Sequence, residues 1–385
     1  MADWIERKIS DIGTVVGGAT PSTKKPENYE DGKIAWITPK DLSAFTGRYI
    51  ECGERNITEV GLRSCSTQLL PKNAVLFSSR APIGYVAIAA NEVCTNQGFK
   101  SVVPNENTDP LFLFYLLKYN KDKIEGMGSG TTFKEVSGNT MKNIVVNVPT
   151  DKGVQEKIAS ILGSIDDKIE ENEQINKNLE QQAQSIFKSW FVNFEPFDSK
   201  KPDNWTISTL GNVSIMSAGG DKPQNVSPIK TALYQYPIFS NGLSDEGLYG
   251  FTDKPKISEE SVTVSARGTI GFVCLRHIPY VPIVRLVTLI PKTEIISAKY
   301  LYLWLKHLHI TGTGTTQQQL TVPDFQKTEI LVPSQKIVTL FTATVEPIFE
   351  KIWANQNENE KLSSLRDTLL PKLMSGELDV SDIEI

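Results

Sequence analysis

The sequence contains one pattern written twice. Residues 75–86, Val-Leu-Phe-Ser-Ser-Arg-Ala-Pro-Ile-Gly-Tyr-Val, align with residues 262–273, Val-Thr-Val-Ser-Ala-Arg-Gly-Thr-Ile-Gly-Phe-Val, 187 positions later. Residues 128–132, Gly-Ser-Gly-Thr-Thr, align with residues 312–316, Gly-Thr-Gly-Thr-Thr, 184 positions later. Because these matches keep their order through each half of the chain, they predict two copies of one domain. The two copies become a pseudo-twofold repeat if the helices that follow them run antiparallel.

Each half begins with a globular segment. Short β-branched runs such as 74–77 and 261–264, bounded by Gly, Pro, Asn and Asp, predict strands and turns. One apolar segment in each half, 111–117 and 300–305, has the composition of a buried helix. A chain of 385 residues is also too long for one compact core. The predicted fold class is therefore α+β, with two mixed α/β domains.

A narrow apolar stripe marks the polar helix that ends each half. In the first helix, the a and d positions of a heptad hold Ile158, Ile161, Ile165, Ile175, Leu179 and Ile186, and Leu162 and Ile169 lie beside this stripe. In the second helix, the same positions hold Phe341, Ile348, Leu362, Leu365 and Leu369. So narrow and long a stripe favours a helix–helix seam, and we predict an antiparallel coiled coil that separates the two domains. The alternative, in which each amphipathic helix packs only on its own domain, stays open.

Two asparagines occupy equivalent places in this predicted seam. Asn172 and Asn355 are 183 positions apart, fall on a positions and lie near the middle of their helices. A buried asparagine lowers the stability of a coiled coil but fixes its register and partner. We therefore predict that Asn172 and Asn355 determine the helix register.

The net charge of −5 is concentrated in the helical segments. We divide the chain into a first domain (1–150), a central helix with a hinge (151–199), a second domain (200–333) and a C-terminal helix with a tail (334–385). Their net charges, counted from Lys, Arg, Asp and Glu, are +1, −5, +3 and −4 in that order. The weakly basic domains permit nucleic-acid binding, which acidic domains would have disfavoured.

Several classes of chemistry lack their motifs in this sequence. It has no G-x-x-x-x-G-K-[ST] phosphate loop and no Asn/Asp-Pro-Pro-aromatic tetrapeptide of an amino-methyltransferase. Three histidines (His277, His307 and His309) and four scattered cysteines offer little for a metal site or a nucleophile, and we expect His307 and His309 at the surface or at a helix end. The amino terminus has no signal-peptide pattern and no apolar run is long enough to span a membrane, so we expect a cytoplasmic protein. The missing motifs favour a non-catalytic, binding protein.

Five short sequence motifs are specific enough to compare with known families. Three lie in the first half, Trp-Ile-Thr-Pro-Lys-Asp-Leu-Ser from Trp36, Leu-Phe-Ser-Ser-Arg-Ala-Pro-Ile-Gly-Tyr-Val from Leu76 and Thr-Asn-Gln-Gly-Phe-Lys from Thr95. The others are Ser-Ile-Phe-Lys-Ser-Trp-Phe-Val-Asn-Phe-Glu-Pro-Phe from Ser185 and Leu-Arg-Asp-Thr-Leu-Leu-Pro-Lys-Leu-Met-Ser-Gly-Glu-Leu from Leu365. These motifs resemble the specificity subunits of type I restriction–modification enzymes. The resemblance covers essentially the whole chain, although the motif around Arg267 in the second domain is a degraded form of the one around Arg80.

The resemblance implies a subunit in which each target-recognition domain binds one half of a bipartite DNA site and the helices set the spacer. It also implies two modification subunits that methylate adenine with S-adenosylmethionine, and restriction subunits that use ATP and Mg²⁺; this chain itself would hold no cofactor. A helix over residues 158–189 would be about 48 Å long at ~1.5 Å per residue. That length equals roughly 14 base-pair steps at ~3.4 Å, and domains attached obliquely would lie about one turn of DNA apart.

The repeat also sorts the candidate DNA-binding residues. If the two domains read different half-sites, the residues that both domains share cannot determine which sequence each one reads. We therefore predict that the repeated arginine turn and the repeated Gly-Thr-Thr loop contact phosphates or serve as scaffold. These shared residues are Ser79, Arg80, Thr131, Thr132, Arg267, Thr315 and Thr316. Unshared loop residues are predicted to read bases, namely Lys40, Gln97, Lys134, Lys222, Asn241, Gln317 and Gln318, with Gln319 beside them. Each prediction has a plain structural alternative. In these alternatives the Gly-Thr-Thr loops are turns that only require glycine, the arginines form hydrogen bonds or ion pairs inside their domain, and the unshared loop residues are solvated.

Two further alternatives concern larger features. An aromatic cluster after the first helix either docks a modification subunit or covers the hinge to the second domain; it comprises Phe187, Trp190, Phe191, Phe194 and Phe197. For the whole chain, the competing functions are the recognition portion of a fused methyltransferase–nuclease and a coiled-coil scaffold that binds no DNA. The fused enzyme would require catalytic motifs that this sequence does not contain.

Overall fold

A computed structural model describes residues 3–43, 45–80, 82–130, 134–308, 310–311, 319–381 and 383. Its internal contacts divide the chain into two units, one formed by Met1–Glu173 with Gln356–Ile385 and the other by Gln174–Asn355. Each unit therefore contains part of the central helical segment and part of the C-terminal one. The division of the chain at 1–150, 151–199, 200–333 and 334–385 stays a prediction.

The first unit contains two sheets and a two-stranded ribbon. The larger sheet has the order β2-β9-β6-β7-β4 (Gly13–Gly17, Lys100–Pro104, Val75–Ser79, Ile83–Ala89 and Tyr49–Ile50). The smaller sheet is β5-β3-β8 (Arg55–Ile57, Ile34–Ile37 and Val93–Thr95), and β1 (Trp4–Lys8) pairs with β10 (Val145–Pro149). Helices cover these strands: α1 (Ile9–Ile12), η1 (Pro26–Asn28), α2 (Pro39–Ser43), α3 (Glu59–Arg63), α4 (Pro110–Tyr119), α5 (Lys121–Gly126) and α6 (Gly138–Asn143).

The second unit repeats this topology. Its larger sheet is β12-β18-β15-β16 (Ser214–Ala218, Val287–Pro291, Ser261–Val264 and Val273–Arg276), and its smaller sheet is β14-β13-β17 (Leu248–Thr252, Tyr236–Phe239 and Val281–Pro282). A ribbon of β11 (Thr206–Thr209) and β19 (Glu329–Val332) matches β1 and β10. The helices are η2 (Glu195–Phe197), α8 (Leu210–Val213), η3 (Ser244–Gly247), α9 (Ala298–His307) and α10 (Val322–Phe325). Within the described residues only β4 lacks a counterpart in the larger sheet, so the predicted duplication of a mixed α/β domain is confirmed.

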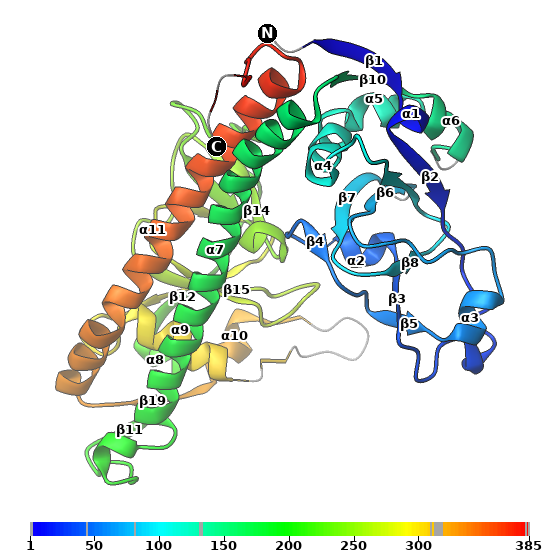
Figure 1. The fold of residues 1–385 in the computed structure, drawn as a ribbon. Helices are drawn as coiled ribbons and strands as arrows, with labels where there is room; N and C mark the ends of the chain where they lie inside the picture. Colours follow the sequence, from blue (N-terminus) through cyan, green and yellow to red (C-terminus); the bar gives the residue numbers. More distant parts are fainter. Residues whose placement is uncertain are drawn as a thin grey trace. The chain divides into compact units, whose positions relative to one another are not determined.

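The two predicted core helices are α4 and α9. Asp109 caps α4 by accepting a hydrogen bond from the backbone N–H of Phe112 (2.7 Å), and residues Phe112–Leu117 are buried. Figure 1 shows α4 against the first half of the long helix α7 (Lys152–Phe191). There the Tyr115 hydroxyl donates to the Asp166 carboxylate (2.6 Å), which ties the first domain to its helix.

The long helices α7 and α11 (Gln335–Met374) contain 40 residues each. In the first unit, Asn359 donates to the Ile169 carbonyl and Arg366 to Asp166, so residue numbers fall along α7 as they rise along α11. The pair is therefore antiparallel, as predicted. One stripe residue was assigned wrongly: Leu365 is 48% exposed. A regular helix drifts by about 20° per heptad relative to a 3.5-residue repeat, and here the neighbouring Arg366 makes the helix contact instead.

Candidate nucleic-acid interface

A turn after β6 holds Arg80 beyond the end of the strand. The Ser78 hydroxyl accepts a hydrogen bond from the Tyr85 backbone N–H (2.8 Å) and donates to the Pro82 carbonyl (2.8 Å). Gly84 has a φ of +100°, a left-handed value that L side chains rarely adopt. The serine and the glycine together explain why the sequence word around Arg80 forms a tight, internally bonded turn.

The second unit builds the same turn after β15. The Ser265 hydroxyl accepts from the Phe272 N–H (2.9 Å) and donates to the Thr269 carbonyl, and Gly271 has a φ of +85°. Each residue lies 187 positions after its counterpart, and the turn exposes Arg267. The word that appears degraded in the sequence therefore keeps its structural residues.

The two arginines have equivalent partners of different charge. Arg80 pairs with Glu135 (Nη1 to Oε2, 3.4 Å), and Lys100 approaches the same carboxylate (Nζ to Oε1, 3.4 Å). Arg267 donates instead to the side-chain oxygen of Gln319 (3.3 Å), 184 positions after Glu135. In the first domain the arginine of the shared turn lies beside a carboxylate that also faces Lys100, so a net positive charge remains there. In the second domain the equivalent arginine contacts a neutral amide. The sequence did not indicate that Glu135 belongs to this site, because Arg80 and Lys100, which contact its carboxylate, lie 55 and 35 positions before it in the chain.

The exposed candidates include Gln97, Lys134 and Lys222. Exposed Lys40 forms an ion pair with Glu54 (2.6 Å), and this hydrogen bond raises the pKa of Lys40. Exposed amines and amides of this kind suit contacts with phosphates or base edges.

Two candidates are held by hydrogen bonds to the protein backbone. Ser79 is fully buried, and its hydroxyl donates to the Gly98 carbonyl (3.1 Å). Asn241 is half-buried, and its side chain accepts from the Ala266 N–H (2.7 Å) and donates to the Val284 carbonyl (2.6 Å). Both side chains therefore hold loops together. The remaining candidates lie outside the described residues: Thr131, Thr132, Thr315, Thr316, Gln317 and Gln318.

The predicted register asparagines are almost fully buried, each at 1% exposure. Asn172 donates to the side-chain oxygens of Glu358 (2.8 Å) and Asn359 (2.9 Å) within the first unit. Asn355 donates to the side-chain oxygen of Asn176 (2.8 Å) within the second. Asn172 and Asn355 are repeat equivalents, and so are Asn176 and Asn359. The same amide pair therefore occurs twice, and whether it fixes the register stays a prediction.

Arg48, which the sequence did not single out, anchors the first domain to α7. Its guanidinium donates to Glu170 (Nε to Oε1, 3.0 Å), to Asp167 and to the Gly163 carbonyl (3.3 Å). Burial opposes the charge, but the hydrogen bonds to Glu170 and Asp167 raise the pKa of Arg48. No counterpart in the repeat and no motif marks this residue.

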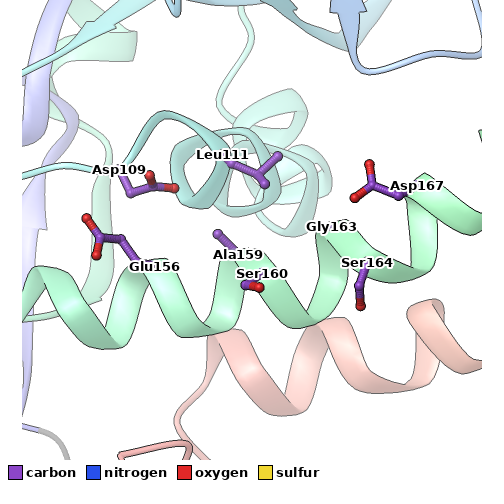
Figure 2. Close-up of a pocket in the computed structure, with 8 residues that line it drawn as sticks. All are labelled: Asp109, Leu111, Glu156, Ala159, Ser160, Gly163, Ser164 and Asp167. Carbon is purple, nitrogen blue, oxygen red and sulfur yellow. The ribbon is translucent and has the colours of Figure 1, made fainter. Parts of the chain in front are cut away.

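A shallow groove of about 300 Å³ runs along the neighbouring face of α7 (Figure 2). Asp109 and Glu156 lie toward one end and Asp167 toward the other, and the rest of the lining is small or apolar: Leu111, Ala159, Ser160, Gly163 and Ser164. Three carboxylates repel phosphates, so this face of the helix is unsuited to DNA and the basic turns remain the better candidates.

The aromatic cluster after α7 packs inside the second unit. Phe187 and Phe191 are buried, and the Phe191 ring centroid lies 4.8 Å from that of Phe341. The Phe197 and Trp205 centroids lie 5.0 Å apart. These contacts support the interpretation in which the cluster covers the junction between α7 and the second domain.

Two other sequence expectations concern histidines and membrane spans. His307 is exposed at the end of α9, as predicted, whereas His309 lies outside the described residues. Within the part of the chain that the structure describes, no helix combines the length and apolarity needed to cross a membrane. The same residues contain no group of three or more metal-ligating side chains.

Known proteins share this sequence pattern. A family model described as the type I restriction modification DNA specificity domain matches residues 1–181 and again residues 202–363. The chain belongs to this family. The two matches fall on the two halves of the repeat, so each half corresponds to one copy of the specificity domain.

Two relatives of this specificity-domain family extend over nearly the whole chain. The type I restriction enzyme MjaIX specificity subunit of Methanocaldococcus jannaschii is 35% identical, over 99% of this chain and 95% of its own. The HindI specificity subunit of Haemophilus influenzae is 26% identical, over 98% of this chain and 100% of its own. A crystal structure of the type I restriction–modification system S subunit from M. genitalium has a TM-score of 0.61 at 18% identity, covering 97% of this chain and 96% of that one. This last likeness supports the fold.

Proposed function

We propose that the chain is the DNA-sequence-specificity subunit of a type I restriction–modification system. Each recognition domain binds one half of a bipartite DNA site, and the paired helices α7 and α11 set the spacer between the halves. The observation that carries the proposal is the arginine turn built twice on a duplicated fold, with an acidic partner in one copy and an amide in the other. A common scaffold with different side chains at its tip is what two different half-sites require.

The chemistry of such a system belongs to other subunits in this proposal. Two modification subunits would methylate adenine with S-adenosylmethionine, and restriction subunits would supply ATP- and Mg²⁺-dependent cleavage in the cytoplasm. The relatives' names as specificity subunits support a non-catalytic role for this chain.

The proposal is tested by purifying the full chain with its modification subunits and mapping the adenines that the complex methylates. We expect one asymmetric motif, with two defined segments separated by a spacer of fixed length. Methylation without sequence preference, or at a single uninterrupted motif, would contradict the proposal.

The two competing functions make different predictions in the same preparation. A fused enzyme predicts methylation by this chain alone, without added subunits. A coiled-coil scaffold predicts no affinity for duplex DNA even at low salt, where phosphate contacts are strongest.

A further inference from the structure

The turn between β17 and β18 holds two consecutive residues in the left-handed conformation. Val284 has a φ of 53° and Arg285 a φ of 65°. Such values are uncommon outside glycine and are outliers for a β-branched residue. Val284 is 50% exposed and Arg285 is exposed as well, so burial of apolar surface does not explain the conformation. Local strain of this kind persists only where the surroundings impose it, and it concentrates at ligand-binding sites.

Three hydrogen bonds impose the conformation. The Val284 N–H donates to the Gly220 carbonyl (2.8 Å), and the Arg285 N–H donates to the Gly219 carbonyl (2.9 Å). The Asn241 amide donates to the Val284 carbonyl (2.6 Å). A Cβ on Gly219 would lie 2.8 Å from backbone atoms of Ile283, so only glycine allows this approach.

The equivalent turn of the first domain is held differently. Gly98 occupies the position of Arg285, 187 residues earlier, and its carbonyl accepts directly from the Ser79 N–H (2.7 Å) beside Arg80. In the second domain, the matching N–H of Ala266 donates to the Asn241 side chain instead (2.7 Å). The asparagine side chain therefore stands between two turns that touch directly in the first domain.

This replacement changes the recognition surface without changing the fold. Asn241 separates the Arg267 turn from the β17–β18 turn by one side chain, and Arg285 adds a guanidinium where the first domain has a glycine. Arginine is the side chain that most often reads guanine, through its paired donors in the major groove. An unshared, exposed arginine on a rigid turn is thus suited to base reading.

We propose that the β17–β18 turn is a base-reading element of the second recognition domain. In this proposal Arg285 is a specificity-determining residue that contacts base edges. Asn241 is a positioning residue that fixes the distance between Arg285 and Arg267. The inference rests on the proposed function, since it assumes that the domain binds a defined half-site.

The test compares Arg285→Ala with Lys327→Ala in the full chain assembled with its modification subunits. Lys327 is 78% exposed at its side chain, so its loss also removes one surface charge from the second unit. We expect Arg285→Ala to weaken binding to the wild-type motif about 10- to 100-fold and to random duplex less than about 3-fold. Methylation mapping should show relaxed selectivity in one half of the motif only, and Lys327→Ala should leave both halves unchanged.

Two variants separate positioning from folding. Asn241→Asp keeps an acceptor for the Ala266 N–H but removes the donor to Val284, and it should relax the same half-site as Arg285→Ala. Val284→Gly relieves the left-handed strain, so it should maintain or raise the thermal midpoint while lowering selectivity for that half-site. A lower midpoint with unchanged selectivity would indicate a purely structural turn and overturn the inference.

The outcomes distinguish this inference from the function on which it rests. Equal losses on motif and random duplexes for Arg285→Ala would indicate a phosphate contact and overturn base reading. An unchanged motif in both Arg285→Ala and Asn241→Asp would overturn the inference while leaving the proposed function intact. A wild-type complex that methylates no defined motif would contradict the proposed function itself.

Discussion

The duplicated asparagine pair allows a prediction with an internal control. In Asn172→Ala, the first unit loses two hydrogen bonds, one to the amide of Asn359 and one to the carboxylate of Glu358. A neutral hydrogen bond contributes about 1 kcal/mol and one to a charged group about 1.5–3 kcal/mol. Because Glu358 is exposed, we take the lower end for the second bond and expect a loss of about 2–3 kcal/mol in the free energy of unfolding.

The equivalent substitution Asn355→Ala should cost much less. It removes only the bond to Asn176, and it also removes the Asn355 side-chain oxygen, which is buried without a hydrogen-bond partner. Leaving such an atom unsatisfied costs about 1–3 kcal/mol, so its removal offsets the lost bond. Both substitutions truncate the same side chain in a similar seam, and we expect their effects to differ by about 2 kcal/mol.

Guanidinium denaturation followed by circular dichroism at 222 nm measures this difference, with light scattering to confirm the association state. The double variant Asn172→Ala with Asn359→Ala should show a coupling energy of about 1 kcal/mol. Equal losses for Asn172→Ala and Asn355→Ala, or no coupling, would refute the hydrogen-bond account. Replacing both Asn172 and Asn355 with leucine should give a protein that is more stable than the double alanine variant but that populates a mixture of association states. A monodisperse double leucine variant with an unchanged DNA spacer would contradict the register hypothesis.

Three further predictions follow from single residues. Arg80→Ala should weaken binding to motif and random duplexes alike, and the slope of log affinity against log salt concentration should become shallower by about 1. Titrations at several salt concentrations measure both effects, and a loss confined to the motif duplex would contradict a phosphate contact. Tyr115→Phe removes the hydroxyl that donates to Asp166, so denaturation should show about 2 kcal/mol less stability, and an unchanged midpoint would show that the bond contributes nothing. His277 stacks on Trp353. Burial of its imidazole, together with the neighbouring cations Lys299 and Arg276, lowers the pKa of His277 from 6.5 to about 4. The unfolded chain therefore takes up a proton first as the pH falls, and wild type should lose thermal stability between pH 6.5 and 4 more steeply than His277→Gln; parallel curves would contradict this.

The sequence was sufficient to predict the duplicated fold, because its signals are local. Turns such as 78–85 require a serine and a left-handed glycine at fixed positions, so both copies keep these residues although neighbouring ones differ. The core helix at Leu111–Leu117 and the paired long helices follow from apolar runs and from heptad spacing. Leu365 shows the limit, since the ideal repeat loses its phase along a long helix.

The interactions at the candidate site depend on segments that are distant in the sequence. Asn241 was predicted as a base reader, but its hydrogen-bond partners Ala266 and Val284 lie 25 and 43 residues away. Its function as a bridge becomes clear only by comparison with the first domain, where the Ser79 N–H donates directly to the Gly98 carbonyl. Arg48 pairs with a helix 119 and 122 residues later, and no pattern announces such a pair. Arg285 escaped notice because a left-handed backbone at a non-glycine residue leaves no trace in composition.

The central claim, that each recognition domain reads one half of a bipartite site, is tested most directly by a chimaera. Residues 202–333 would be replaced by the corresponding segment of a family member with a different motif, and the chimaera assembled with the modification subunits. Mapping of methylated adenines should then show one half of the motif exchanged for that of the donor, with the other half and the spacer unchanged. A change in both halves, or an unaltered motif, would contradict the account.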